Sequence, residues 1–282
     1  MKLVMTLLVR DESDIIRENI EFHRAQGVDF IIAMDNLSQD STPYILKEYE
    51  EQRVLYYIAQ HDDDYNQAAW VTYMARMACS DFGADWVINN DADEFWWPAH
   101  GSLKTTFEAF PEQVNIVRAP RHNFVMTGDP QRPFWSRMIY REQQSKNPLG
   151  KPLPPKVAHR ALETIRVEQG NHSVSGFDSM AHASGEPIQV FHFPMRNLKQ
   201  IEQKIAKGGA AYERNTVLTA SVGSTWRELY RQYQAEGSLY NYYKQNSYSN
   251  EEIALALSAN RLVTDTRLHD FFNSRGADAP EF

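Results

Sequence analysis

The sequence predicts an α/β fold in which helices flank a central, mostly parallel sheet, followed by a helical C-terminal extension. Short apolar runs alternate with stretches of helical periodicity over residues 1–97. Turn-forming residues separate these segments, and helical patterns dominate after residue 195. Strands that alternate with helices typically form a parallel sheet that is covered on both faces.

The first half of the chain supplies four strands and three helices. Residues 3–9 form an apolar run with the length of a buried strand, and Gly27 is well placed to end the helix that follows. Thr42 is expected to be an N-cap, with Pro43 in the first helical turn. The predicted strands are 3–9, 28–34, 53–59 and 85–90, and the predicted helices are 13–26, 43–52 and 66–80.

The second half is less regular. Its predicted strands are 113–118, 165–167 and 187–193, and its predicted helices are 102–110, 197–207, 224–236 and 249–260. The last helix opens with the capping box Ser249-x-x-Glu252. Residues 121–156 form a proline-rich stretch without clear periodicity. Long loops of this kind often bind ligands, so we expect this one to contribute to recognition.

Composition excludes several classes of protein. The net charge of −8 makes a nucleic acid an unsuitable partner, because its phosphates require a basic surface. No apolar run is long enough for a membrane span, and no secretion signal is evident, so we expect a cytoplasmic protein. Cys79 is the only cysteine, which rules out a disulfide within the chain.

Three polar clusters follow predicted strands, and the most acidic contains Asp91 and Asp93. An extended backbone points these two carboxylates in the same direction, where they repel unless a cation lies between them. Mg²⁺ or Mn²⁺ suits such oxygen ligands, although an ordinary acidic turn has the same pattern. Because ligands bind at the carboxyl ends of parallel strands, we expect this cluster to converge with Arg10–Glu12 and Asp35–Asp40.

These motifs together resemble a known family. The segments that carry the resemblance are Arg10–Asp11–Glu12, Gly27–Val28–Asp29, Asp35–Asn36-x-Ser38-x-Asp40 and Asp91–Ala92–Asp93–Glu94–Phe95. They resemble family-2-like glycosyltransferases of the GT-A fold, and most closely the subgroup related to glycosyltransferase family 92. The resemblance is specific over residues 3–97 and looser over 156–207. It implies transfer of a sugar from a nucleotide donor, usually a UDP-sugar, to an acceptor hydroxyl, with Mn²⁺ or Mg²⁺.

The resemblance also implies a metal site. By match to the Asp-x-Asp motif, Asp93 would ligate the metal and Asp91 would contact the metal or the ribose. His192 is expected to be the third ligand, with His172 as the alternative. Glu94 is either an outer-sphere partner of the metal or an ordinary surface acid.

Donor-binding residues follow from the same match. Asp35 would accept a hydrogen bond from the nucleotide base, although it equally suits a turn that caps the next helix. The other expected donor-binding residues are Arg10, Glu12, Asp91, Lys156, Arg196 and Lys204, with Arg160 as a further candidate to neutralise the diphosphate.

The base and the acceptor site are the least defined. The family's inverting mechanism requires a general base, for which Asp178 is the first choice, Glu163 the second and His172 the third. Trp96 and Trp97 are expected to form an acceptor platform, since indole rings stack on sugars, with packing in the core as the alternative for either residue.

We therefore predict a metal-dependent hexosyltransferase. Residues 1–194 would form the catalytic domain, divided at residue 97 into nucleotide-binding and acceptor halves, and residues 195–282 would pack on it as helices. Two alternatives remain open. A nucleotidyltransferase would need a glycine-rich phosphate loop after the first strand, where Val9–Glu12 has no glycine. A non-catalytic nucleotide- or carbohydrate-binding protein of the same fold would retain the sheet without the reaction.

Overall fold

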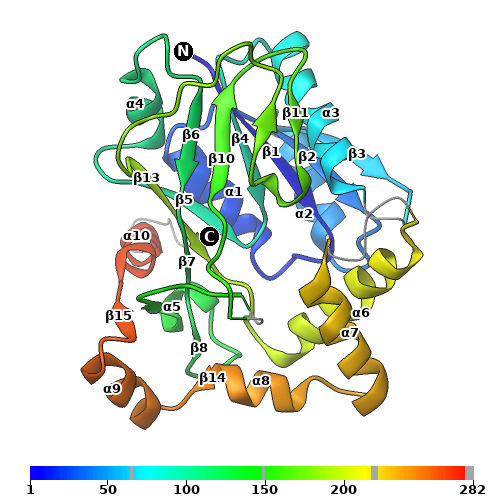
Figure 1. Cartoon of the computed structure of the whole chain (residues 1–282), viewed down its shortest axis with the longest axis vertical. Helices are drawn as coiled ribbons and strands as arrows, with labels where there is room; N and C mark the ends of the chain where they lie inside the picture. Colours follow the sequence, from blue (N-terminus) through cyan, green and yellow to red (C-terminus); the bar gives the residue numbers. More distant parts are fainter. Residues whose placement is uncertain (64–65, 148–149, 217–221, 277–282) are drawn as a thin grey trace. The chain divides into compact units, whose positions relative to one another are not determined.

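The computed structural model describes residues 1–63, 66–147, 150–216 and 222–276. The chain divides into two compact units (Figure 1). The first unit contains Met1–Arg121 and Pro154–Phe191, and the second contains His122–Leu153 and His192–Phe282. These boundaries differ from the predicted ones because most of the proline-rich stretch belongs with the C-terminal segment. Two of its residues, 148–149, lie outside the described part of the chain.

A six-stranded sheet forms the centre of the first unit, in the order β3-β2-β1-β4-β10-β6 (Figure 1). Its strands are β1 (Leu3–Val9), β2 (Phe30–Asn36), β3 (Leu55–Gln60), β4 (Trp86–Asp91), β6 (Ile116–Ala119) and β10 (Lys156–Arg160). The first four strands of the chain are parallel to one another, whereas β10 is antiparallel to β4 and β6. The predicted mostly parallel sheet is confirmed.

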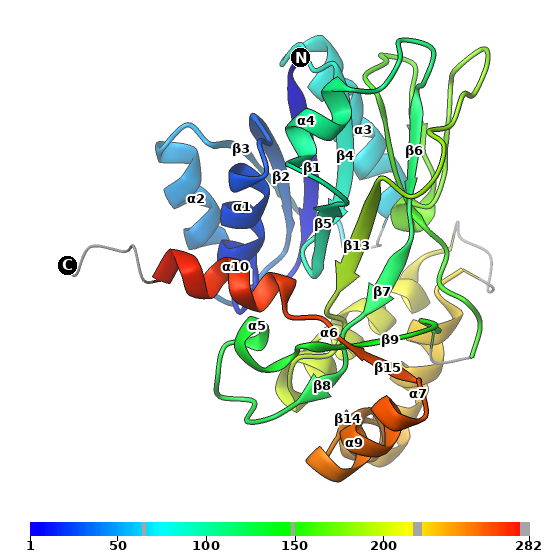
Figure 2. The ribbon, with the colours of Figure 1, turned by 90° about the vertical axis from the view of Figure 1, so that its left-hand side faces the viewer.

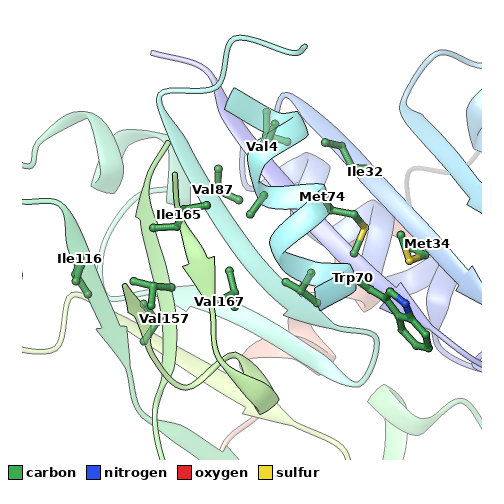
Figure 3. Close-up of a cluster of buried hydrophobic side chains, with 14 residues drawn as sticks. Val4, Ile32, Met34, Trp70, Met74, Val87, Ile116, Val157, Ile165 and Val167 are labelled. Carbon is green, nitrogen blue, oxygen red and sulfur yellow. The ribbon is translucent and has the colours of Figure 1, made fainter. Parts of the chain in front are cut away.

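Helices cover both faces of this sheet. They are α1 (Ile16–Ala25), α2 (Thr42–Glu51), α3 (Gln67–Ser80) and α4 (Leu103–Glu108). Figure 2 shows α1 and α2 on one face of the sheet and α3 on the other. Trp70 and Met74 of α3 belong to the same buried cluster as Val4, Ile32 and Val87 of the sheet (Figure 3). Burial of this helical stripe explains why residues 67–80 form a helix.

One predicted cap is wrong. The N-cap of α2 is Ser41, and Thr42 is the first residue of the helix. The Thr42 hydroxyl accepts a hydrogen bond from the backbone N–H of Glu12 at 3.0 Å. A long-range contact has thus taken the hydroxyl that the local pattern assigned to capping.

The remaining strands form small sheets. The three-stranded sheet has the order β5-β13-β7, and two-stranded sheets pair β11 with β12, β14 with β8 and β15 with β9. Their bounds are β5 (Glu94–Pro98), β7 (Arg121–Asn123), β8 (Met126–Thr127), β9 (Tyr140–Glu142), β11 (Arg166–Val167), β12 (Val174–Ser175), β13 (Ile188–His192), β14 (Ser247–Tyr248) and β15 (Leu262–Thr264). A short 3₁₀ helix, η1 (Gln169–Asn171), follows β11.

Helices dominate the C-terminal part of the second unit, as predicted. They are α6 (Leu198–Arg214), α7 (Ser224–Glu236), α8 (Tyr240–Asn246), α9 (Asn250–Ser258) and α10 (Arg267–Gly276), and α5 (Phe134–Arg137) lies earlier in the same unit. The capping box of α9 is confirmed, with reciprocal hydrogen bonds between Ser249 and Glu252. Among the described residues, no helix combines the length and apolarity that a membrane span requires.

A buried histidine of the central sheet makes the stability of the fold depend on pH. His159 on β10 is fully buried, and burial lowers its pKa from 6.5 to about 4. Between these values the unfolded chain binds more protons than the folded one, so stability falls as the pH falls. The loss contributed by His159 is about 3 kcal/mol at pH 4.

We therefore expect the free energy of unfolding of His159→Leu to fall less steeply with decreasing pH than that of the wild type. Urea unfolding measured at intervals from pH 7 to pH 4 would test this, because the substitution removes one proton-binding group from the unfolded state. Equal pH slopes for the two proteins would contradict the prediction.

Candidate functional site

The carboxyl ends of the parallel strands meet at one edge of the six-stranded sheet, which we call the carboxyl edge. Val9 at the end of β1 pairs with Asp35 in β2, and Leu8 pairs with Asp91 at the end of β4. These registers bring the three polar clusters to the same edge. The convergence predicted from the sequence is confirmed.

The turn between β4 and β5, residues 91–94, is held by one buried asparagine. Asn19 on α1 donates from Nδ2 to the carbonyl oxygens of Ala92 at 2.9 Å and Glu94 at 2.8 Å. An amide nitrogen has two hydrogens, and both are used here. The backbone that carries Asp93 is therefore fixed on both sides.

Asn19 is in turn held by Asn90 and His23, and Trp96 contacts both of these residues. Asn90 donates from Nδ2 to Asn19 Oδ1 at 3.1 Å, and His23 Nδ1 lies 2.8 Å from the Asn19 carbonyl oxygen. The indole N–H of Trp96 donates to Asn90 Oδ1 at 3.0 Å, and its backbone N–H donates to His23 Nε2 at 3.3 Å. Because that backbone N–H can only donate, the His23 hydrogen is on Nδ1, where it meets the Asn19 carbonyl.

This packing corrects the predicted acceptor platform. Trp96 is fully buried, so it offers no ring face to a sugar. The Trp97 ring stacks on Phe22 and on Phe191, with centroid separations of 5.5 and 5.3 Å. Trp96 belongs to the core, while Trp97 is half-buried with its ring stacked between two phenylalanines.

Asp91 is surrounded by donors from other elements. Lys156, which is almost fully buried at the start of β10, makes a short ion pair with Asp91 Oδ2. Asn171 and Gln67 donate to Asp91 Oδ1 at 3.1 and 3.3 Å. Because these bonds use both oxygens, Asp91 is held as an ion-pair partner at the carboxyl edge.

Glu94 is the fully buried carboxylate of the turn. It pairs with Arg121 at 3.3 Å and with Lys156 at 3.2 Å. Burial is the main reason that its pKa is raised to about 7, and Lys156 opposes that shift. The nearby charges of Asp91 and Asp93 raise the pKa further, so a cation beside these carboxylates would favour the ionised form.

Asp93 and Glu94 each offer a ligand atom to the same point as His192. These three atoms lie within 4.8 Å of one another, a spacing that suits a metal ion. His192 is the last residue of β13. Two carboxylates and an imidazole form a donor set that suits Mn²⁺.

The cluster differs from the predicted ligand set in one residue. The group contains Asp93 and His192 of the predicted set, and Glu94 stands in it where the sequence analysis placed Asp91. Asp91 and Glu94 lie on either side of the turn, and the alternation of an extended strand could not predict how that turn reverses.

Asp35 lies in a partly enclosed acceptor site at the same edge. Its side chain accepts from the Ser38 backbone N–H at 3.3 Å and from the Tyr57 hydroxyl at 3.2 Å. Burial raises the pKa of Asp35 above its ordinary value. Nearby, Arg10 pairs with Asp63 at 2.6 Å, and Glu12 is buried before α1.

The loop 169–172 adds a residue that sequence reasoning missed. Asn171 has a φ of +61° and directs its amide to Asp91. His172, beside it, contacts the Pro155 carbonyl at 3.0 Å. Burial, helped by the charges of Lys156 and Arg121, lowers the pKa of His172 to about 3. A neutral imidazole with so low a pKa is a weak general base.

Asp178 and Glu163 were predicted as general bases, and the structure places both at the opposite edge of the sheet. Because β10 is antiparallel to β4, Arg160 pairs with Trp86, five residues before Asp91. That offset corresponds to about 16 Å along a strand. The chain after Arg160 continues away from the carboxyl edge, as shown by the hydrogen bond from Ala161 to the Asp85 carbonyl.

The surroundings of both acids confirm this placement. Glu163 lies in the turn before β11, and a Cβ on Gly176 would come within 2.8 Å of the Thr164 carbonyl oxygen. Ser179 accepts from Asn115, whose own carbonyl accepts from Arg160. The structure therefore places neither acid at the carboxyl edge. Arg160, with its guanidinium over the Trp86 ring at 4.7 Å, lies too far from the carboxyl edge to neutralise a diphosphate.

Two predicted donor-binding residues belong to the second unit. Arg196 is fully buried and donates to the Phe193 carbonyl at 3.1 Å. Lys204 lies over the Trp226 ring, 6.0 Å from its centroid. Their roles in donor binding stay predictions.

A mostly parallel sheet whose carboxyl edge carries an acidic turn is the architecture that the resemblance to GT-A glycosyltransferases predicted. A sequence profile of glycosyltransferase family 92 matches residues 5–160, which is more than half of the chain. The chain belongs to glycosyltransferase family 92. No curated protein sequence matches it.

Several solved structures show limited similarity to the chain. S. aureus TarS residues 1–349 in complex with UDP is 12% identical, with a TM-score of 0.45 over 89% of this chain and 77% of that one. A mannosyltransferase from Pyrobaculum calidifontis, in complex with GDP-Man and Mn²⁺, is 19% identical with a TM-score of 0.36. That match covers 43% of this chain and only 35% of the mannosyltransferase. Glucosyl-3-phosphoglycerate synthase from Mycobacterium tuberculosis is 15% identical, with a TM-score of 0.32 over 43% of this chain and 44% of that one.

Proposed function

We propose that this protein is a metal-dependent hexosyltransferase that moves a sugar from a UDP-sugar to an acceptor hydroxyl, with inversion at the anomeric carbon. One observation carries the proposal. Asp93, Glu94 and His192 bring three ligand atoms within 4.8 Å at the carboxyl edge, where α/β sheets bind their ligands.

These residues fit Mn²⁺ or Mg²⁺. The two carboxylates suit both ions, and the imidazole nitrogen favours Mn²⁺ over Mg²⁺. Burial is the main cause of the raised pKa of Glu94, and the charges of Asp91 and Asp93 add to it. A divalent ion bound there would stabilise the negative charge that develops on the departing diphosphate.

The protein's own groups would orient the donor. Asp35 would accept the imide N–H of uracil, and the Tyr57 hydroxyl bonded to it holds the carboxylate in place. Lys156 is buried between Asp91 and Glu94, where its charge offsets two of the three carboxylates. Arg10, Glu12, Arg196 and Lys204 stay in the proposal as donor contacts.

Inversion is the course that the family implies, and it requires a base near the acceptor hydroxyl. Of the three predicted bases, His172 lies at the carboxyl edge, but its low pKa makes it unsuitable in the conformation described here. None of the three predicted residues is therefore assigned as the base. The anomeric configuration of the product, read by proton NMR, tests inversion independently of that assignment.

Thermal shift with UDP tests the metal-dependent donor site. We expect UDP with Mn²⁺ to raise the melting temperature, because a ligand at 100 times its Kd adds about 2.7 kcal/mol of stability. UDP with EDTA should produce a much smaller shift. If UDP stabilises the protein equally with and without metal, the metal-dependent site is wrong.

Product analysis separates the alternatives. A glycosyltransferase should slowly release free sugar and UDP from a UDP-sugar in the presence of Mn²⁺. A nucleotidyltransferase would instead form a nucleotide sugar from UTP and a sugar phosphate. A binding protein without activity would show the thermal shift and neither product.

A further inference from the structure

Asn123 in β7 contacts Nδ1 of the predicted metal ligand His192. The backbone N–H of Phe124 donates to the His192 carbonyl at 2.8 Å, which aligns the ends of β7 and β13. The Asn123 Oδ1 atom then lies 2.8 Å from Nδ1 of the His192 ring. The contact joins two residues of the second unit.

The orientation of the Asn123 amide is set by its other partners. Its Nδ2 atom lies 3.1 Å from Glu142 Oε2 and 3.1 Å from the Lys146 carbonyl oxygen. A backbone carbonyl can only accept, so the amide nitrogen must face Lys146. Its oxygen must therefore face His192.

This orientation determines the His192 tautomer. An amide oxygen cannot donate, so the hydrogen of the contact belongs to His192 Nδ1. In the neutral imidazole the lone pair is then on Nε2. A metal binds only an unprotonated ring nitrogen, and the group that holds the other nitrogen sets which one it is.

We propose that Asn123 is a positioning residue that fixes His192 in the Nδ1–H tautomer and so presents Nε2 to a divalent cation. The inference deepens the proposed function and rests on it for the identity of the ligand. Asn123 is itself restrained, because its backbone N–H donates to the Ser145 hydroxyl at 2.8 Å.

The inference also gives the proline-rich stretch a role besides recognition of an acceptor. Asn123, Glu142, Ser145 and Lys146 all lie within residues 121–156. The hydrogen bonds of the last three converge on Asn123, and Asn123 in turn contacts His192.

Nitrogen NMR tests the tautomer directly on the protein without metal. A long-range ¹H–¹⁵N spectrum at alkaline pH should show His192 with its hydrogen on Nδ1, the signals being assigned by their absence in His192→Gln. Asn123→Leu should lose this preference. Asn123→Asp should keep it, because a carboxylate also accepts from Nδ1–H.

Binding of Mn²⁺ alone, followed by loss of the free-ion EPR signal, tests the consequence. We expect Asn123→Leu to weaken Mn²⁺ binding by roughly 10–100-fold, as for other partners that hold a metal ligand. Glu142→Gln is the matched control, because an amide oxygen can still accept from Asn123 and the affinity should stay close to that of the wild type.

The outcomes separate this inference from the proposed function. If the wild type carries its hydrogen on Nε2, or if Asn123→Leu keeps both the tautomer and the Mn²⁺ affinity, the role of Asn123 is wrong. The wild type could instead carry its hydrogen on Nδ1 and yet bind no Mn²⁺. The proposed metal site would then be wrong, and so would the presentation of Nε2 to a cation.

Discussion

Replacing Asp93 by asparagine is expected to lower the rate of sugar transfer by roughly 100–1,000-fold, the range seen when one electrostatic stabiliser is removed. The substitution keeps the size of the side chain but removes a charge from the proposed metal site. It should not unfold the protein, because the charge of Asp93 raises the pKa of buried Glu94 and is therefore unfavourable to its ionised neighbour. Turnover of a UDP-sugar at saturating Mn²⁺ would test the expected loss of rate. Urea unfolding of the same variant would test the expectation that it stays folded.

Two acids at the other edge of the sheet supply matched controls. Asp178 and Glu163 are exposed and lie away from the carboxyl edge, so Asp178→Asn and Glu163→Gln should retain nearly full activity. Near-normal turnover in Asp93→Asn would remove this residue from the mechanism. A large loss in Asp178→Asn would instead restore it as a candidate base.

The sequence predicted the parallel half of the fold because hydrophobic periodicity and turn residues act locally. Residues 3–9 form an apolar run with the length of a buried strand, and β1 occupies that same range. The antiparallel strand β10 was not predicted, because its residues follow a proline-rich stretch and its partners β4 and β6 lie far away in the sequence. Pairing over such distances leaves no local periodic signal.

The same contrast between local and long-range signals explains which site residues could be predicted from the sequence. Asp35, Asp91 and Asp93 lie directly after or within predicted strands, so their convergence followed from the topology. Asn19 was missed because it lies on a helix face whose partner, the turn 91–94, is more than 70 residues away. Glu163 and Asp178 were misplaced because β10 carries the chain to the opposite edge, and the chain returns there after the loop 169–172 has reached Asp91.

A second large effect is expected at Asn19. Asn19→Asp has nearly the same shape, but an ionised carboxylate cannot donate to the Ala92 and Glu94 carbonyls. Leaving buried acceptors without partners costs about 1–3 kcal/mol each, so we expect a loss of roughly 2–6 kcal/mol at neutral pH. The turn that carries Asp93 would loosen, and Mn²⁺ affinity should fall with it.

The pH dependence separates a lost hydrogen bond from a general packing defect. Burial of the new carboxyl raises its folded pKa above the unfolded value of about 3.9. Its protonated form can donate to one of the two carbonyls, so Asn19→Asp should differ least from the wild type near pH 4 and lose stability relative to it as the pH rises.

Asn115→Asp is the matched control, because Asn115 also donates to a backbone carbonyl but lies at the opposite edge, where it contacts Ser179. It should leave Mn²⁺ affinity unchanged. Equal Mn²⁺ affinities in Asn19→Asp and Asn115→Asp would mean that the hydrogen bonds from α1 stabilise the fold without positioning Asp93. A selective loss in Asn19→Asp would make the amide of a buried helix residue part of the geometry by which the acidic turn holds its cation.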